Sequence, residues 1–239
     1  MNTLHELKVK IFADGADLNG ITALANNPLI KGFTTNPTLM NKAGITDYRA
    51  FSLDVLQIIG DRPVSFEVFS DDFTEMERQA LEIASWGKNV FVKIPVTNTH
   101  NLFAGNLIQR LSSAGVQVNV TALMTLEQVK AVRDCLNPQT PSCISVFAGR
   151  VADTGCDPVP MMVSAVRELK SHPKNELIWA SPRELLNIFH AEHAGCQIIT
   201  VTHDILAKLH LIGKNLDEYS LDTVKMFYND AVRAGFKIS

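Results

Sequence analysis

Short apolar runs and longer amphipathic segments follow one another in a regular order along this chain. Eight runs of four to seven residues, mostly β-branched, aromatic or otherwise apolar, favour strands. They cover residues 9–13, 30–35, 64–69, 90–96, 116–120, 143–147, 177–180 and 197–201. Because most of these runs are continuously apolar rather than alternating, they indicate a parallel sheet that is covered on both faces.

A segment with helical features follows each run. We expect helices over residues 17–26, 37–59, 73–86, 101–114, 124–135, 158–170, 181–194 and from the last run to about residue 211. Gly44 is expected to interrupt the second helix, and Asn36 before Pro37 is typical of its start. The segment 149–157 is polar and is expected to be a loop.

Eight strand–helix units predict an α/β fold, a single (β/α)₈ TIM barrel that spans residues 1–239 as one domain. The alternative is a doubly wound open sheet, but no GxGxxG follows the first strand. Residues 221–234 predict an extra amphipathic C-terminal helix, with Val224, Phe227, Tyr228 and Ala231 on one side. We expect that helix to contact another subunit of a homo-oligomer; the alternative is that it closes the bottom of its own barrel.

Composition narrows the class of protein. Apolar residues make up 46%, charged residues 20%, and the net charge is −3 with no basic run, so neither a nucleic-acid nor a membrane partner is expected. Residues 1–10 contain no apolar signal-peptide core, and no apolar run is long enough to span a bilayer, so a cytoplasmic location is expected. The four cysteines form no CxxC pair and are expected to be reduced, and the histidines form no metal motif.

Lys93 interrupts the apolar run 90–96. An unpaired buried ammonium is costly, and such a lysine tends to lose its charge. A neutral amine is a nucleophile that forms a Schiff base with a carbonyl. The alternative is a lysine that is paired with a buried carboxylate, or one whose amine extends from the end of the strand to water.

Other polar residues interrupt or close the same runs, near their C-terminal ends, where a barrel has its active site. They are Asp14, Thr34, Asn36, Glu67, Asn119, Thr121, Ser145, Arg150, Ser181 and Arg183. Each has an ordinary alternative: Asp14 as a turn residue, Asn36 as a helix cap, Glu67 as a partner of Lys93, the arginines at the surface. Together they supply an amine, two carboxylates for proton transfer, and two arginines at the expected helix start Ser181, which suits a phosphate. This set of groups favours a Schiff-base aldolase that acts on a sugar phosphate.

The chain resembles the transaldolase family, which also contains the small fructose-6-phosphate aldolases. The segments that carry the resemblance are Phe12-Ala13-Asp14, Gly32-Phe33-Thr34-Thr35-Asn36-Pro37, Val92-Lys93-Ile94-Pro95-Val96, Asn119-Val120-Thr121, Phe147-Ala148-Gly149-Arg150 and Ala180-Ser181 with Arg183. The resemblance implies sugar-phosphate substrates and a mechanism without metal or organic cofactor.

The resemblance also implies the finer roles. Lys93 forms the Schiff base with the ketose C2 carbonyl, and Asp14 takes the C4 hydroxyl proton. Glu67 acts through a water that Thr121 helps to hold. Asn36 and Asn119 hold hydroxyls of the dihydroxyacetone fragment, and Thr34, Ser145 and Phe147 line the same pocket. Arg150, Ser181 and Arg183 match the phosphate-binding positions.

Two positions separate the branches of the family. The aldolase branch has Gln in place of Glu67 and Tyr in place of Phe147, so this chain resembles the transaldolases at both positions. Dihydroxyacetone transfer is therefore the expected reaction. The alternatives are a lyase that releases free dihydroxyacetone and a non-catalytic sugar-phosphate-binding barrel.

The chain also departs from the family pattern. Gly15 replaces a more usual Thr or Ser, and Pro182 a more usual Phe. Residues 153–158 resemble neither branch. Pro182 adjoins the expected phosphate site, so the chain length of the sugar and the position of its phosphate are left open.

Overall fold

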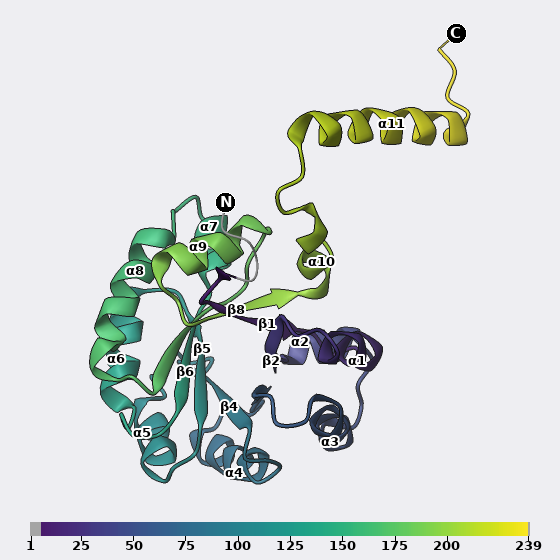
Figure 1. Cartoon of the computed structure of the whole chain (residues 1–239). Coiled ribbons are helices and arrows are strands. Elements are labelled where there is room, and N and C mark those ends of the chain that lie inside the picture. The colour runs from purple at the N-terminus through teal and green to yellow at the C-terminus, as the bar shows by residue number, and fades with distance from the viewer. Residues whose placement is uncertain (1–5, 239) are drawn as a thin grey trace.

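The computed structural model describes residues 6–238, so half of the N-terminal segment 1–10 lies outside the described part of the chain. The described chain forms a closed barrel whose strands pair in sequence order from β1 to β8 (Figure 1). The strands are β1 (Lys10–Asp14), β2 (Ile30–Thr34), β3 (Val64–Glu67), β4 (Val90–Pro95), β5 (Val118–Leu123), β6 (Ser142–Val146), β7 (Asn175–Trp179) and β8 (Ile198–Thr202). The predicted (β/α)₈ barrel is confirmed, and the open sheet is excluded.

Helices connect the strands and cover the outside of the barrel (Figure 1). They are α1 (Leu18–Ala25), α2 (Pro37–Lys42), α3 (Tyr48–Ile59), α4 (Phe73–Ala84), α5 (Gly105–Ser113), α6 (Leu126–Cys135), α7 (Ala148–Asp153), α8 (Val159–Glu168), α9 (Leu186–Ala194), α10 (His203–Leu206) and α11 (Leu216–Ala234). Two 3₁₀ turns, η2 (Leu169–Ser171) and η3 (Leu209–Leu211), extend the connections after α8 and α10.

Side-chain caps fix several helix starts at the residues that the sequence indicated. The Asn36 side chain accepts a hydrogen bond from the Leu39 N–H at 3.0 Å and so begins α2 beside Pro37. Asp72 accepts from the Glu75 N–H at 2.9 Å and begins α4. Gly44 has a φ of 71°, which favours glycine, and the predicted interruption between α2 and α3 is confirmed.

The strand register brings polar residues from neighbouring strands to the same level. Asp14 pairs with Thr34 on one side and with Thr202 on the other. Glu67 pairs with Lys93, which in turn pairs with Asn119. Because these pairs lie at or near the C-terminal ends of parallel strands, their side chains meet at one end of the barrel.

Beneath this polar level lies an apolar cluster within the barrel. Phe12, Cys143 and Ile198 belong to it, and each stands two residues before a polar residue of the same strand. Because side chains of a strand alternate between its faces, the apolar and polar residues lie one above the other on the inner face. A larger apolar cluster fills the space between the outer face of the strands and the helices. The closed interior therefore gives the polar level a rigid apolar base.

Several predictions about local structure were wrong. The segment expected to be a loop begins with helix α7, because the chain turns at once after β6 and Gly149 packs closely against the Ser181 carbonyl. Helix α9 begins at Leu186 rather than Ser181, since Ser181 has a left-handed φ of 58° that no helix start accepts. The fifth strand is displaced toward its C-terminus, where Ala122, with a φ of 66°, lies at an irregularity of the register.

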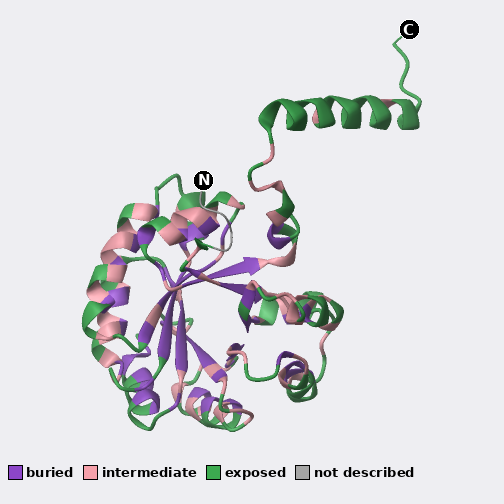
Figure 2. Cartoon of the chain, in the orientation of Figure 1, coloured by how far each residue is buried: buried purple, intermediate pink, exposed green. Residues whose placement is uncertain are grey.

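The last helix, α11, extends away from the barrel (Figure 1). It begins at Leu216 rather than at residue 221, because the Asn215 side chain caps the N–H groups of Asp217 and Glu218. None of its residues is buried, and all but Thr223 and Ala231, which are half-buried, are exposed (Figure 2). Among residues 6–238, no helix is both long enough and apolar enough to cross a membrane.

Candidate active site

A cavity of about 440 Å³ opens at the C-terminal ends of the strands. The structure brings every site residue that the sequence predicted to its wall. They are Asp14, Thr34, Asn36, Glu67, Lys93, Asn119, Thr121, Ser145, Phe147, Arg150, Ser181 and Arg183. Residues from the first strand to the loop after the seventh therefore share one cavity.

Lys93 lies at the base of this cavity and is almost fully buried. Its Nζ atom is 3.0 Å from Glu67 Oε2 and donates a hydrogen bond of 2.9 Å to the backbone carbonyl of Thr35. The Lys93 side chain is 8% exposed and that of Glu67 17%, so the amine reaches solvent only through the cavity. The sequence left open whether Lys93 pairs with Glu67. The structure shows this pair, and the paired amine still faces the cavity.

Asp14 carries the other carboxylate of the site. Burial raises the pKa of Asp14 above its ordinary value, while the Lys93 ammonium and the hydrogen bond from Thr34 oppose that rise. Thr34 Oγ1 donates to Asp14 Oδ1 at 2.7 Å and also contacts the hydroxyl of Thr200. Two hydroxyls from β2 and β8 thus fix the orientation of this carboxylate, and its raised pKa suits a group that takes and returns a proton.

Amide and hydroxyl groups connect the middle strands. Asn119 donates from Nδ2 to Ser65 Oγ at 2.9 Å, and its Oδ1 accepts from Ser145 Oγ at 2.7 Å. With both ends of its amide bonded, Asn119 is held in one orientation. The hydroxyl of Thr121 is buried and has no hydrogen-bond partner within residues 6–238, so it is free to bind a ligand or a water in the cavity.

Glu67 is supported from outside the barrel by Tyr48 on α3. The Tyr48 hydroxyl donates to the Glu67 carbonyl at 2.7 Å and accepts from the Glu67 N–H at 2.8 Å. Burial raises the pKa of the Tyr48 phenol far above its ordinary value, so the phenol stays protonated and remains a donor. Because β3 ends at Glu67, this pair of bonds replaces the ladder partners that its backbone would otherwise lack.

The two arginines lie at the other side of the cavity, on α7 and the loop before α9. The Arg150 guanidinium lies over the Phe147 ring, 5.5 Å from its centroid. Arg183 donates from Nε and Nη2 to the carboxylate of Asp153, at 2.9 Å and 2.5 Å. This guanidinium lowers the pKa of Asp153 and is itself held in place by it. The expected helix N-terminus is absent here, since Ser181 precedes α9 by five residues, so this side of the cavity offers an anion the two arginines and the Ser181 hydroxyl.

Sequence reasoning missed several groups of the site. Thr200 and Thr202 line the cavity, and Ser65 supports Asn119. All three are polar residues in apolar strands, the signal that found Asn119 and Thr121, so that signal was available. The Thr35 carbonyl and Tyr48 gave no signal, because one is backbone and the other belongs to an outer helix. No three His, Cys, Asp or Glu residues in the part of the chain from 6 to 238 gather closely enough to hold a metal ion.

The fold and this cavity together define the class of protein: an α/β barrel with a buried amine, two carboxylates and an arginine pair at the C-terminal mouth. Among solved structures, a dihydrodipicolinate synthase from Rhodopseudomonas palustris matches with a TM-score of 0.58 and 12% identity, covering 98% of this chain and 82% of that one. A 2,3-dimethylmalate lyase matches with a TM-score of 0.54 and 14% identity, covering 98% and 86%. At these identities the likeness concerns the barrel fold alone.

Sequence comparisons are more specific. The profile of the Transaldolase/Fructose-6-phosphate aldolase family matches residues 11–238. A probable transaldolase from Dehalococcoides mccartyi is 33% identical over 202 residues, covering 84% of this chain and 90% of the relative. One from a Thermoanaerobacter species is 31% identical over 231 residues, covering 96% and 100%. The chain belongs to the transaldolase/fructose-6-phosphate aldolase family, and the resemblance inferred from its motifs is confirmed.

Proposed function

We propose that this protein is a transaldolase that transfers a dihydroxyacetone unit from a ketose phosphate to an aldose phosphate through a Schiff base on Lys93. Donors of the fructose 6-phosphate or sedoheptulose 7-phosphate type fit this chemistry. The observation that carries the proposal is the position of the Lys93 amine, 3.0 Å from the Glu67 carboxylate in a cavity that Asp14 also lines. Binding alone requires no buried amine between two carboxylates.

In the first step, Lys93 gives a proton to Glu67 and its free amine attacks the C2 carbonyl of the ketose. The carbinolamine then loses water to form the iminium, and the Glu67 carboxyl returns the proton that this water needs. The free hydroxyl of Thr121 is suited to hold that water. The C2–O bonds are thereby exchanged for a C2=N bond with no net change in oxidation state.

In the second step, Asp14 accepts the proton of the C4 hydroxyl. The C3–C4 bond breaks, its electrons move into the iminium to give an enamine, and an aldose phosphate leaves. An acceptor aldehyde then receives the C3 carbon of the enamine, and Asp14 returns its proton to the new hydroxyl. Hydrolysis of the Schiff base releases the new ketose phosphate and regenerates Lys93. Asn36 and Asn119 hold the hydroxyls of the dihydroxyacetone fragment in this proposal, which their position in the cavity wall supports.

The arginine side of the cavity is suited to the phosphate. Arg150 and Arg183 lie on separate elements that converge on the wall of the cavity with Ser181. A guanidinium offers paired N–H donors to a phosphate, and the positive charges of two guanidinium groups attract the negative charge of the phosphate. A phosphate held there leaves the carbonyl end of the sugar directed toward Lys93.

Transfer is preferred to release because of Phe147 and Glu67. Phe147 presents no hydroxyl to the enamine, so it has no proton to give. Arg150 covers its ring at 5.5 Å. The enamine is therefore expected to persist until an aldehyde arrives. The lyase that releases dihydroxyacetone remains the second candidate, since it needs the same Lys93 chemistry.

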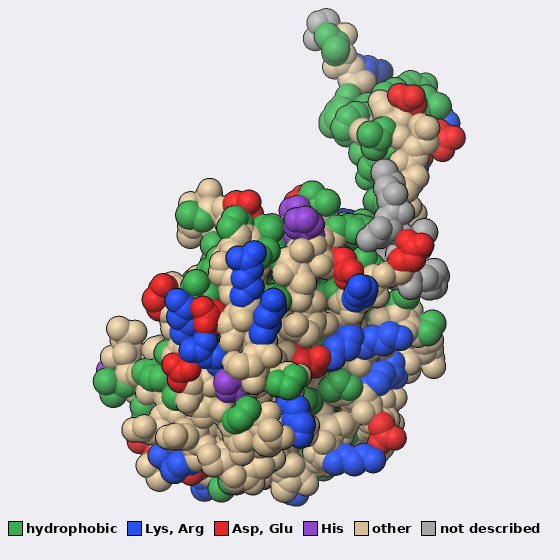
Figure 3. Space-filling view, turned by 60° about the vertical axis from the view of Figure 1, so that its left-hand side comes forward, with side chains coloured by type: hydrophobic (Ala, Val, Ile, Leu, Met, Phe, Trp, Pro, Cys, Tyr) green, Lys and Arg blue, Asp and Glu red, His purple; other side chains and the backbone are tan. Residues whose placement is uncertain are grey.

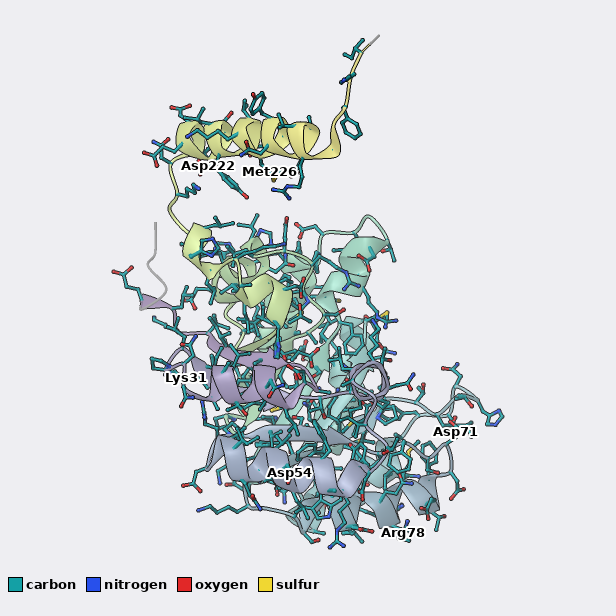
Figure 4. The ribbon with its side chains drawn as sticks, turned by 90° about the vertical axis from the view of Figure 1, so that its right-hand side faces the viewer. Lys31, Asp54, Asp71, Arg78, Asp222 and Met226 are labelled. Carbon is teal, nitrogen blue, oxygen red and sulfur yellow. The ribbon has the colours of Figure 1, made fainter. Side chains whose placement is uncertain are left out.

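Borohydride trapping tests the Schiff base. Reduction in the presence of fructose 6-phosphate is expected to add the mass of the reduced sugar fragment to wild-type protein and not to Lys93→Ala. The matched control is Lys31→Ala, because Lys31 is also a strand lysine but is exposed and donates to the Pro28 carbonyl (Figure 4). It is expected to trap as the wild type does. Absence of any adduct with ketose phosphates would favour a non-catalytic barrel.

A coupled assay separates transfer from release. With fructose 6-phosphate, glyceraldehyde 3-phosphate production is expected to require added erythrose 4-phosphate. Equal turnover without this acceptor, together with free dihydroxyacetone, would identify the lyase instead.

A further inference from the structure

The hydrogen bonds between β2 and β3 depart from a regular parallel ladder beside the candidate Schiff-base lysine. The Thr35 N–H donates to the Ser65 carbonyl at 3.2 Å, which continues the ladder one residue beyond β2. In a regular ladder, the Glu67 N–H would next donate to the Thr35 carbonyl, and the N–H of residue 37 would donate to the Glu67 carbonyl. Residue 37 is proline and has no N–H, so the Glu67 carbonyl needs another donor.

The hydroxyl of Tyr48, on α3, takes the place of both ladder partners of Glu67. It accepts from the Glu67 N–H at 2.8 Å and donates to the Glu67 carbonyl at 2.7 Å. Because the Glu67 N–H is bonded to Tyr48, the Thr35 carbonyl remains available, and it accepts from Lys93 Nζ at 2.9 Å. One phenol thus fixes the backbone of Glu67 and leaves Lys93 an acceptor that a regular ladder would have used.

The Tyr48 ring is held at this place by aromatic packing outside the barrel. Its centroid lies 6.0 Å from that of Trp86, whose ring in turn lies 5.9 Å from that of Phe66 on β3. Tyr48 is not among the residues that line the cavity. Any effect of its hydroxyl on the reaction therefore passes through Glu67 and Lys93.

The Lys93 amine has two fixed acceptors, and Tyr48 bears on both of them. One is the Thr35 carbonyl at 2.9 Å, and the other is Glu67 Oε2 at 3.0 Å. These two bonds leave the nitrogen one further position for a carbonyl carbon in the cavity that Lys93 lines. Attack on a carbonyl depends on such a fixed direction, because a misplacement of about 1 Å costs about 10²-fold in rate.

We propose that Tyr48 is a positioning residue for Schiff-base formation, which directs the Lys93 amine and the Glu67 carboxylate toward a bound carbonyl. It does so by holding the Glu67 backbone and keeping the Thr35 carbonyl for Lys93. The inference rests on the proposed function, in which Lys93 attacks a ketose and Glu67 carries its proton. Without the phenol, the Glu67 N–H turns to the Thr35 carbonyl, its regular ladder acceptor, and displaces the amine from it.

Tyr48→Phe removes the hydroxyl and keeps the packed ring. Samples that are quenched with borohydride at successive times give the single-turnover rate of Schiff-base formation with fructose 6-phosphate. The maximal rate is expected to fall about tenfold to a hundredfold, because the amine loses its direction. The sugar concentration at half the maximal rate is expected to stay within about twofold of wild type, because no residue of the cavity wall has changed. An unchanged maximal rate, or a loss carried entirely by weaker sugar binding, overturns the proposal.

Ser52→Ala is the matched control on α3. Ser52 is buried, and its hydroxyl donates to the Tyr48 carbonyl at 2.8 Å. Removing it takes a buried hydrogen bond from the same helix but leaves both bonds between the Tyr48 phenol and Glu67 in place. Both variants are expected to lower the thermal midpoint, whereas only Tyr48→Phe slows trapping. Equally slow trapping in Ser52→Ala would attribute the loss to a destabilised helix and overturn the proposal.

A crystal structure of Tyr48→Phe reads the exchange of partners without any catalysis. The Glu67 N–H is expected to bond to the Thr35 carbonyl, and Lys93 Nζ to leave it. A Lys93 amine that keeps its 2.9 Å bond to that carbonyl overturns the proposal. If wild-type protein forms no adduct with ketose phosphates while this exchange still occurs, the proposed function fails and the link between Tyr48 and the Lys93 amine stands.

Discussion

At the scale of single residues, the site depends on groups whose charge is set by burial and by close partners. Lys93 is buried but remains bonded to Glu67 and to the Thr35 carbonyl, so its amine is both satisfied and reachable from the cavity. Asp14 is half-buried, accepts a hydrogen bond from the Thr34 hydroxyl, and has a raised pKa because its carboxylate is desolvated. The same features that suit these residues to proton transfer are costly for folding, since burial penalises a charged form.

Asp14→Asn is expected to reduce kcat/KM about 10²-fold to 10⁴-fold while raising stability at neutral pH. Because the folded-state pKa of Asp14 lies above its ordinary value of 3.8, the folded state holds the proton longer than the unfolded state. The contribution of Asp14 to the free energy of unfolding is therefore most favourable at acidic pH. It declines as the pH rises from about 4 toward the raised folded-state pKa. The amide never ionises and escapes this decline. Thermal unfolding of wild type and Asp14→Asn between pH 4 and pH 8 measures the difference in stability between the two proteins. A difference that narrows toward neutral pH would contradict the expectation.

Phe147→Tyr is expected to increase free dihydroxyacetone release relative to transfer by about tenfold to a hundredfold, since it places a proton donor beside the enamine. The measurement is product analysis with and without an acceptor aldehyde. Phe69→Tyr makes the same change at a residue that is 64% exposed and outside the cavity, and should leave the ratio unaltered. Loss of both activities in equal measure would assign Phe147 to substrate packing instead.

At the scale of elements, a close contact between helix α7 and the loop before α9 forms the arginine side of the cavity. Gly149 in α7 packs against the Ser181 carbonyl, and its N–H donates to the Ala180 carbonyl at 3.4 Å. Ser181 adopts a left-handed φ of 58°, which a non-glycine residue keeps only where its surroundings hold it. The Asp153–Arg183 ion pair spans the same two elements. Together these contacts place Arg150 and Arg183 on one wall of the cavity.

Gly149→Ala is expected to raise KM for phosphorylated substrates more than it lowers kcat, and to destabilise the fold by about 1–3 kcal/mol, because the new methyl group displaces the Ser181 carbonyl. Ala152→Ser is the control on the exposed side of the same helix. Steady-state kinetics and denaturant unfolding together measure both effects. If kcat falls and KM stays constant, α7 positions the reacting groups rather than the phosphate.

At the scale of the whole molecule, the barrel buries its own apolar surface, whereas α11 leaves its apolar side chains exposed. Leu216, Val224, Phe227 and Tyr228 are 60–79% exposed. Apolar side chains gather along this helix where it extends from the barrel (Figure 3). Asp222 and Met226 lie on it with no barrel element against them (Figure 4). A helix with this much apolar surface gains by burial, and its distance from its own barrel favours a second copy of the chain as the partner.

Phe227→Asp is expected to lower the oligomeric mass in solution, because a carboxylate resists burial in the proposed contact between copies. Asn229→Asp adds the same charge at an exposed polar position of α11 and is expected to keep the mass. Light scattering coupled to size-exclusion chromatography measures both. A monomeric wild-type protein would rule the contact out, and a monomeric Asn229→Asp would attribute the effect to charge alone.

The sequence by itself determined the barrel, because eight apolar runs and their helices leave few other arrangements. It also located the polar residues at one end of the barrel, because the C-terminal ends of the strands converge there. It predicted that Lys93, Asp14 and Glu67 lie together at that end for the same reason, and the structure brings all three to one cavity. Only the tertiary structure decided how these groups are held. The bonds from Thr34 to Asp14 and from Tyr48 to Glu67, and the contacts of Gly149 with Ser181 and of Gly15 with His203, each join segments far apart in sequence. Local propensity carries no information about such contacts, since they depend on backbone positions that exist only once the barrel has closed.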